Sequence, residues 1–214
     1  MAERKSIHFA EDEDVARARA LWQENGRPII IGLALGLAGI AGYNYWQGYQ
    51  QQQGEQASLL FDQLRSGVED AVALRLGEQL QADHSATVYA ALGTFSLAKI
   101  FVEQGDYDSA AGELQWVLDN SADAGLRHIA RSRLASVYLA ENRHDDVIDL
   151  LSGVEAGTFA ARYSELLGDA HAARNGGGDR EKAREHYAES LAELPEGSLS
   201  GAVMQLKIDN LAAQ

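Results

Sequence analysis

Cysteine is absent from this chain of 214 residues. Its absence excludes disulfide frameworks, thiolate zinc sites, iron–sulfur clusters, a cysteine nucleophile and a bacterial lipoprotein anchor. Proline is rare, with 2 residues, whereas 46% of the residues are hydrophobic, a composition typical of an ordered, helical chain. Lysine and arginine number 18 against 32 aspartates and glutamates, so the formal net charge is −14. Such a chain is a poor partner for nucleic acid, whose phosphates require clusters of basic side chains.

The longest stretch without a charged residue lies between Arg27 and Glu55. Within it, residues 28–46 would form about 28 Å of helix, close to the hydrocarbon thickness of a bilayer. Pro28 suits the first turn of such a helix, where the missing N–H costs no hydrogen bond. Four aromatic residues suit the headgroup layer at its C-terminal end: Tyr43, Tyr45, Trp46 and Tyr49. We predict a transmembrane anchor over residues 28–48.

A buried core helix and a cleaved signal peptide are the two alternatives for this segment. A core helix of this length would normally carry a polar stripe. A signal peptide could use residues 29–41 as its apolar region and Gly39-Ile40-Ala41 as its cleavage site. However, the 27 residues before the segment contain 6 acids and 5 bases, whereas a signal peptide opens with a short basic stretch. An uncleaved anchor explains the segment better.

Basic residues near the ends of the anchor predict its orientation. Five of them precede it (Arg4, Lys5, Arg17, Arg19 and Arg27), and the next base in the chain is Arg65. The N-terminal arm, residues 1–27, is therefore expected in the cytoplasm, and residues 49–214 are expected to be exported. In a bacterium this predicts a single-pass inner-membrane protein with a periplasmic C-terminal domain, an oxidising location compatible with the absence of cysteine.

Gly32 and Gly36 stand in GxxxG spacing within the anchor. Glycines at this spacing let a second membrane helix approach closely, so they are candidate contacts for a membrane partner. The alternative is that glycine is simply common in membrane helices.

Three segments of the exported part share one pattern. A leucine and a small residue are followed by an aromatic residue three positions after the small one, then by turn residues, and then by the apolar residues of a second helix. The small residues Ala98, Ala135 and Gly168 are 37 and 33 residues apart. This spacing resembles the tetratricopeptide repeat, a helix–turn–helix unit of about 34 residues that stacks on its neighbours. We predict an all-α chain, in which one N-terminal transmembrane helix precedes a tetratricopeptide-repeat-like α-solenoid.

The rest of the exported part is expected to form the ends of this stack. Residues 55–90 should add a helical pair with a degenerate pattern, and residues 199–212 a terminal helix that caps the stack. Two features depart from the repeat: Val147 stands where alanine is usual, and the glycines at 176–178 lengthen the third turn.

No catalytic or metal-binding pattern emerges from the sequence. Glu141 and His144 are three residues apart, but one such pair in a turn does not make a metal site. The glycines at 176–178 precede no Gly-Lys-Ser/Thr element and follow no strand, which excludes a phosphate-binding loop. We expect a binding scaffold without cofactors rather than an enzyme.

In stacked hairpins the first helix of each pair lines a concave groove. By their position in the repeat, eight residues are candidates to face this groove and bind a partner: Phe95, Lys99, Glu103, Ser132, Ser136, Arg162, Glu165 and Asp169. The alternative is that they are ordinary solvated residues. Because residues 55–214 carry a net charge of −13, we expect an acidic groove that favours basic or unfolded segments and disfavours nucleic acid.

Several short elements occur in a distinctive order around the anchor. They are Trp22-Gln23-Glu24-Asn25-Gly26-Arg27 before it, Tyr43-Asn44-Tyr45-Trp46 at its end, and residues 114–118, 129–135, 168–169 and 204–211 further on. In this order the chain resembles the YfgM-type ancillary subunits of the SecYEG translocon, which are bitopic inner-membrane proteins. The resemblance runs nearly end to end, with one departure at Leu21-Trp22, where the family often has two adjacent aromatic residues.

The resemblance implies association with the SecYEG translocon and with PpiD, a membrane-anchored periplasmic chaperone of the peptidyl-prolyl isomerase type. It implies a non-enzymatic role in handling proteins as they emerge from the translocon, and it supplies no catalytic residues. The residues alone leave open a membrane-anchored repeat adaptor for another envelope process, such as cell division, cell-wall synthesis or outer-membrane assembly.

A topology reporter tests the expected orientation. Alkaline phosphatase fused after Gln214 should be active, because this enzyme needs an oxidising compartment and the bases before the anchor favour a cytoplasmic N-terminus. A reporter that is active only in the cytoplasm, fused at the same residue, is the control. A signal from that control fusion would overturn the orientation.

Overall fold

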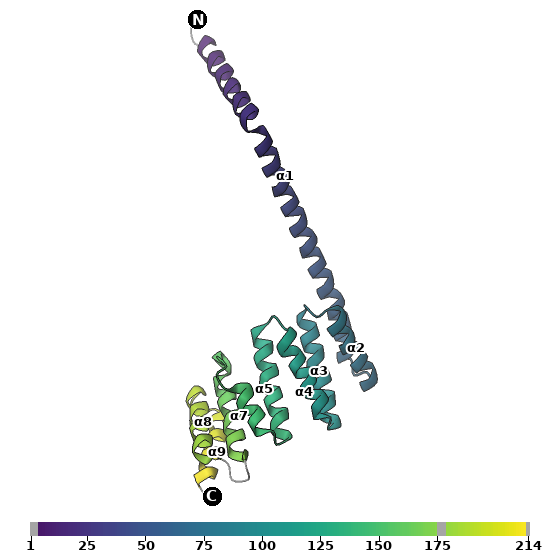
Figure 1. The fold of residues 1–214 in the computed structure, drawn as a ribbon, viewed down its shortest axis with the longest axis vertical. Coiled ribbons are helices and arrows are strands. Elements are labelled where there is room, and N and C mark those ends of the chain that lie inside the picture. The colour runs from purple at the N-terminus through teal and green to yellow at the C-terminus, as the bar shows by residue number, and fades with distance from the viewer. Residues whose placement is uncertain (1–3, 175–178, 213–214) are drawn as a thin grey trace. The chain divides into compact units, whose positions relative to one another are not determined.

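The structure is a computed structural model that describes residues 4–174 and 179–212 (Figure 1). Every regular element among these residues is helical, which confirms the all-α prediction. The chain divides into two compact units, Met1–Gln52 and Gln53–Gln214, and we call the second the repeat unit. The elements are α1 (Arg4–Arg65), α2 (Asp70–Asp83), α3 (Val88–Gln104), α4 (Tyr107–Asn120), α5 (Ala124–Ala140), α6 (His144–Leu151), the 3₁₀ turn η1 (Gly157–Phe159), α7 (Ala160–Ala173), α8 (Arg180–Glu193) and α9 (Leu199–Ala212).

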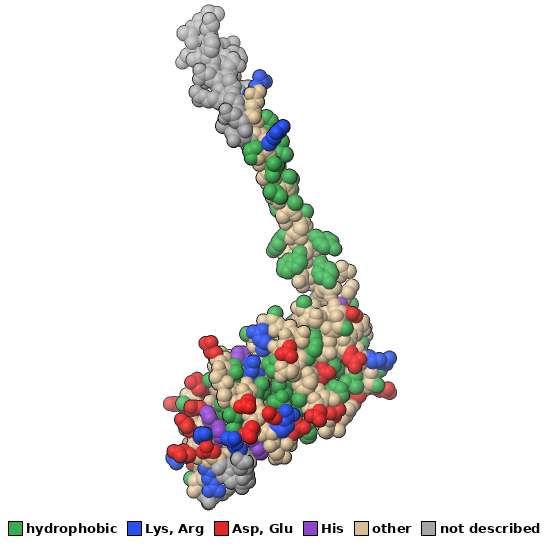
Figure 2. Space-filling model, viewed as in Figure 1, with side chains coloured by type: hydrophobic (Ala, Val, Ile, Leu, Met, Phe, Trp, Pro, Cys, Tyr) green, Lys and Arg blue, Asp and Glu red, His purple; other side chains and the backbone are tan. Residues whose placement is uncertain are grey.

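Helix α1 contains the one segment of the described residues that is long and apolar enough to cross a membrane, by its length and composition. Its large apolar side chains are exposed; Leu33 is 64% and Leu35 is 69% exposed, and Figure 2 shows such side chains along the helix. A row of exposed leucines and isoleucines on a helix is unfavourable in water and favourable in lipid. The segment therefore fits a membrane location, while the anchor boundaries at residues 28 and 48 stay predictions.

Pro28 does not lie in the first turn of its helix, and that prediction was wrong. Helix α1 begins at Arg4, so Pro28 is in the interior, where its missing N–H leaves one carbonyl oxygen of the preceding turn without its usual donor. The residues before the proline are rich in alanine, glutamate and arginine. These are strong helix formers, and they explain why the helix continues through the proline instead of starting at it.

Capping residues mark the ends of several helices of the repeat unit. Gly105 ends α3 with a φ of 76°, the left-handed conformation that glycine adopts without strain. Asp106 then precedes α4, and its carboxylate accepts a hydrogen bond from the backbone N–H of Ser109. Asp123 and Asp179 cap α5 and α8 in the same way. Because α3 and α4 are separated by only two residues, they form a tight helical hairpin.

The helices of the repeat unit pack on their neighbours in chain order (Figure 1). One core cluster joins α3, α4 and α5 around Leu114, and the next joins α5, α6 and α7 around Leu166. A third joins α8 and α9 around Met204 and also contacts α7. Successive clusters share a helix or contact one, so the hairpins depend on one another for burial of their apolar faces.

Both predicted end elements of the stack are present. The helix α9 occupies the residues expected of the terminal cap. The pair expected within residues 55–90 consists of the last turns of α1 together with α2, and it buries Ala57, Leu64 and Leu80 against Ala90 of α3. Val147, which replaces the usual alanine, is fully buried in α6. The lengthened third turn at 176–178 lies outside the described residues.

Small residues occupy the points where helices approach closely. Ala98 and Ala135 are 4% and 0% exposed, respectively. At Gly168 an added Cβ would collide with the ring of Tyr187 in α8. That ring is held in place because the Tyr187 hydroxyl donates a hydrogen bond of 2.8 Å to Asp169. Even a methyl group at residue 168 would therefore push α7 and α8 apart.

Two glycine substitutions test this close approach. Gly168→Ala should be less stable than Gly112→Ala by about 1–3 kcal/mol, the usual cost of overpacking. Gly112 lies inside α4 with nothing within 4 Å of an added Cβ, so the two variants gain the same helix propensity and differ in the collision. Unfolding followed by circular dichroism measures the difference. Equal stabilities would show that α7 and α8 do not touch at this point.

Candidate protein-binding groove

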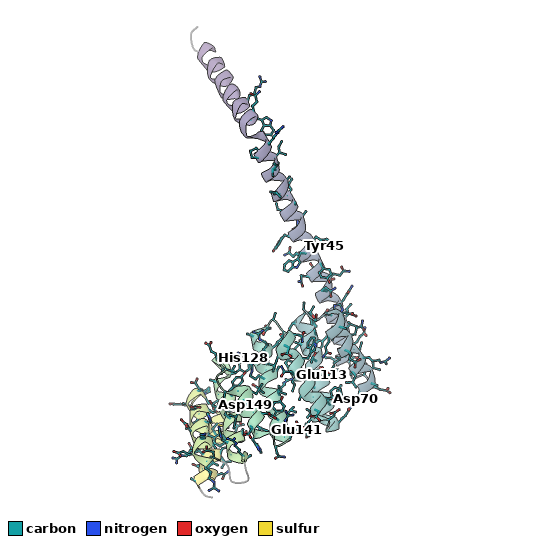
Figure 3. All side chains as sticks on the ribbon, in the orientation of Figure 1. Tyr45, Asp70, Glu113, His128, Glu141 and Asp149 are labelled. Carbon is teal, nitrogen blue, oxygen red and sulfur yellow. The ribbon has the colours of Figure 1, made fainter. Side chains whose placement is uncertain are left out.

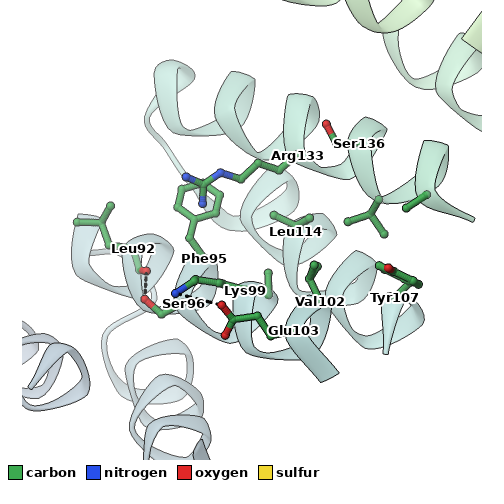
Figure 4. Close-up of a pocket in the computed structure, with 13 residues that line it drawn as sticks. Leu92, Phe95, Ser96, Lys99, Val102, Glu103, Tyr107, Leu114, Arg133 and Ser136 are labelled. Atoms are coloured by element: carbon green, nitrogen blue, oxygen red, sulfur yellow. Dashed lines mark hydrogen bonds and ion pairs between the residues drawn. The ribbon is translucent and has the colours of Figure 1, made fainter. Parts of the chain in front are cut away.

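An open groove of about 690 Å³ lies between α3 and α5, with Leu114 of α4 beneath it (Figure 4). We call it the α3–α5 groove. Most of its lining is apolar, and Phe95, Val102 and Val137 contribute to it. Its volume falls within the range of about 300–1,000 Å³ that is usual for ligand pockets. The helices α3 and α5 are the first helices of consecutive hairpins, so the groove lies where the repeat pattern predicts it.

The charged side chains of the α3–α5 groove are two bases and one acid. Lys99 and Glu103 form an exposed ion pair with a distance of 3.3 Å between Nζ and Oε1. Arg133 lies over the ring of Phe95, with 4.5 Å between Cζ and the ring centroid. The expectation of an acidic groove is therefore wrong here. The domain's negative charge lies elsewhere on its surface, and a sum over the sequence does not resolve that distribution.

A second cavity, of about 460 Å³, lies between the start of α7, the end of α8 and α9. Its lining includes Phe159, Arg162 and Glu165 from one side and Leu199 and Val203 from α9. Leu199 is 83% exposed, so this cavity also has an apolar, solvent-facing edge.

A chain of polar contacts connects α5, α7 and α9 beside this second cavity. Arg162 donates to Glu165 at 2.7 Å and to the hydroxyl of Ser136 at 3.1 Å. The ammonium of Lys207 in α9 donates to Glu165 at 3.0 Å and to Asp169 at 2.7 Å. It lies 5.3 Å from the centroid of the Tyr187 ring. We call Lys207, Glu165, Asp169 and Tyr187 the Lys207 clamp, because together they fasten α9 onto α7 and α8.

Glu165 is held in its ionised form by two cations. Burial raises the pKa of this carboxyl, but the hydrogen bonds and charges of Lys207 and Arg162 lower it by more, so the pKa lies below its ordinary value of 4.5. A carboxyl with a depressed pKa in the folded state adds stability above its unfolded pKa. That stability is lost as the pH falls through the lower, folded-state pKa.

The structure brings most of the sequence-predicted site residues to one of these two cavities. Phe95, Lys99, Glu103 and Ser136 line the α3–α5 groove, and Arg162 and Glu165 line the second cavity. Asp169 belongs to the Lys207 clamp. Ser132 lies apart, since it is 8% exposed and its hydroxyl donates to the backbone carbonyl of His128. Their role in binding a partner stays a prediction.

Some histidines and acids of the described part of the chain make contacts that connect structural elements or turns. His128, labelled in Figure 3, is 2.7 Å from the hydroxyl of Tyr163 and joins α5 to α7. Glu141 pairs with Arg143 at 3.2 Å. Across residues 4–174 and 179–212, no group of three or more histidines and acids is arranged to hold a metal ion.

Sequence reasoning missed Arg133 and Lys207. Arg133 follows Ser96 by 37 residues, the same offset that separates Ala98 from Ala135, so the repeat register could have marked both as groove positions. Lys207 lies in the terminal helix, outside the repeat pattern. No spacing in the sequence shows that its ammonium reaches acids some forty residues earlier.

Comparison with known proteins shows which family this sequence resembles. The family described as a tetratricopeptide repeat-like domain matches residues 19–213. The ancillary SecYEG translocon subunit of Haemophilus influenzae is 30% identical over 203 residues, which are 94% of this chain and 97% of that protein. The Escherichia coli protein of the same name is 27% identical over 208 residues, 96% of this chain and 98% of that protein. No solved structure matches the chain.

The fold and the groove thus define a tetratricopeptide-like repeat protein with an apolar N-terminal helix. Within that class, the chain belongs to the family of the ancillary SecYEG translocon subunits. The family resemblance found in the sequence is confirmed.

Replacing the cation of the Lys207 clamp tests its contribution. Lys207→Met should lower the free energy of unfolding by about 1–3 kcal/mol at pH 7, because Glu165 and Asp169 lose their shared partner. The loss should shrink as the pH falls through the folded-state pKa of Glu165, which lies below 4.5, because the protonated carboxyl no longer needs the ammonium.

Lys99→Met is the matched control. Its ion pair with Glu103 is 74% and 61% exposed, so the change should stay within about 0.5 kcal/mol. Denaturant unfolding between pH 3.5 and 7 measures both variants. A loss for Lys207→Met that does not depend on pH would contradict the electrostatic account.

Proposed function

We propose that this chain is a non-enzymatic, ancillary subunit of the SecYEG translocon that helps to handle exported proteins. The observation that carries the proposal is similarity to proteins of that name over 94–96% of the chain, through the apolar helix and the repeat unit alike. A repeat domain without an anchor would match only the C-terminal part. Similarity through both parts favours a shared task at the membrane.

The proposed location is the bacterial inner membrane, with the N-terminus in the cytoplasm and the repeat unit in the periplasm. The bases before the apolar segment and the uncharged flank after it support this orientation. The repeat unit would then lie on the side of the membrane where translocated chains emerge.

Within the membrane, Gly32 and Gly36 are proposed to contact another helix. Nothing lies within 4 Å of a Cβ added at either residue, so this face of α1 is open. Glycines of such a face allow a close approach that van der Waals packing stabilises.

The repeat unit is proposed to bind protein segments in its grooves, alongside a PpiD-like periplasmic chaperone. Stacked helical hairpins present extended concave surfaces for this purpose. The α3–α5 groove supports the proposal because it is open, largely apolar and flanked by charged side chains. An adaptor for division, cell-wall synthesis or outer-membrane assembly would use the same surfaces. The identity of the bound partners therefore distinguishes these functions.

Site-specific photo-crosslinking in living cells tests the proposal. A photoreactive amino acid at Lys99 should crosslink to translocon subunits, to the chaperone or to exported chains, because Lys99 is 74% exposed at the rim of the groove. The matched control is the same substitution at Arg184, an exposed residue of α8 outside both cavities. Recovery only of other envelope machinery would support the alternative function.

Charge reversal provides a second readout. Lys99→Glu and Arg162→Glu together should lower recovery of the partner several-fold, whereas Arg184→Glu should leave it unchanged. Recovery of SecYEG with the tagged full chain in mild detergent, before and after the changes, is the measurement. Unchanged recovery would remove Lys99 and Arg162 from the binding surface.

A further inference from the structure

The α3–α5 groove combines an apolar interior with a single unbalanced charge. Leu114 and Val137 are nearly buried beneath it, and Val102 is 38% exposed at its rim. These side chains can surround an apolar group brought by a partner, since burying apolar surface is favourable and needs no matching geometry. The lining of the α3–α5 groove therefore favours a bulky apolar side chain of the partner over a polar one.

The charge of the groove is positive. Lys99 and Glu103 neutralise each other through their ion pair. Within the part of the chain that the structure describes, Arg133 has no carboxylate partner, and its guanidinium lies over the Phe95 ring. The local balance is therefore one positive charge, on a repeat unit whose overall charge is strongly negative.

The contact with Phe95 prepares Arg133 for an anion. An arginine that lies over an aromatic ring is held by a cation–π interaction and keeps the N–H groups at its edge free. A guanidinium edge matches the two oxygens of a carboxylate, which can accept two parallel hydrogen bonds. In Figure 4, Arg133 lies over Phe95, with Leu114, Val102 and Tyr107 further along the groove to one side of them.

We propose that the α3–α5 groove binds extended protein segments in which a bulky apolar side chain is next to a carboxylate. The apolar side chain packs above Leu114, and the carboxylate binds Arg133. This inference rests on the proposed function, in which the grooves bind protein segments, and it specifies the chemistry of those segments. It reverses the preference for basic segments that the net charge of the chain suggests.

The overall acidity of the repeat unit does not cancel this preference. Exposed charges interact over about 8–10 Å at physiological salt, so distant acids are largely screened from a ligand in the groove. Arg133 acts at hydrogen-bond distance, where screening is weak. General acidity is instead expected to reject segments that carry several carboxylates and few apolar groups.

Binding of four labelled peptides to the full chain in nanodiscs tests the proposal. The peptides share a Gly/Ser background and differ in one central pair: Phe-Glu, Phe-Gln, Phe-Lys or Ala-Glu. By fluorescence anisotropy, Phe-Glu should bind about fivefold more tightly than Phe-Gln or Ala-Glu. Phe-Lys should bind most weakly of the three Phe peptides.

Arg133→Gln separates the charge from the apolar contact. It should remove the difference between Phe-Glu and Phe-Gln while leaving the affinity for Phe-Gln unchanged. The control Arg184→Gln makes the same change on an exposed residue of α8 outside the groove, and it should preserve the difference. Circular dichroism of both variants checks that the helices are intact.

Two results would overturn the inference. Equal binding of Phe-Glu and Phe-Gln, or tighter binding of Phe-Lys, would show that Arg133 does not select a carboxylate. Absence of binding by every peptide would show that the groove is not a peptide site. Because recovery of SecYEG with the full chain is measured separately, either result with intact recovery overturns this inference alone.

Discussion

Mutual burial of the apolar faces of successive hairpins is the constraint on which the repeat unit depends. A helical hairpin of this size cannot form a core alone, so α3, α4 and α5 share one cluster and α5, α6 and α7 share the next. Close contact requires small residues at the crossings, as at Ala135 and Gly168. The same stacking places α3 beside α5 and creates the groove between them. The stacking of the hairpins thus provides both the stability of the repeat unit and its candidate binding surface.

The periodic part of the fold could be predicted from the sequence. The leucine–small pairs and the turn residues report local geometry, and stacking follows from them because each unit has only one apolar face. The caps at Asp106 and Asp123 are local signals of the same kind. The terminal helix could be predicted as well, since an end hairpin still has an apolar face to cover.

Three features were not predicted, because the sequence pattern does not show which of several possible contacts a residue makes. Pro28 looked like a helix start, yet helix-forming residues before it extend α1 to Arg4. Ser132 has a groove position by register, but its hydroxyl is turned to the carbonyl of His128. The charge of the groove depends on which of the domain's charged side chains meet there, and Arg133 becomes significant only beside Phe95. Composition carries no such positional information.

The Lys207 clamp has a consequence for folding during synthesis, because its residues are made at different times. Lys207 lies in α9, so the ribosome makes α7 and α8 before it supplies the cation that Glu165 and Asp169 share. Until α9 docks, Tyr187 and its neighbours in α8 lack their apolar cover. Without α9, the apolar face of α8 is therefore exposed, Asp169 lacks its cation, and Glu165 keeps only Arg162 as a cationic partner.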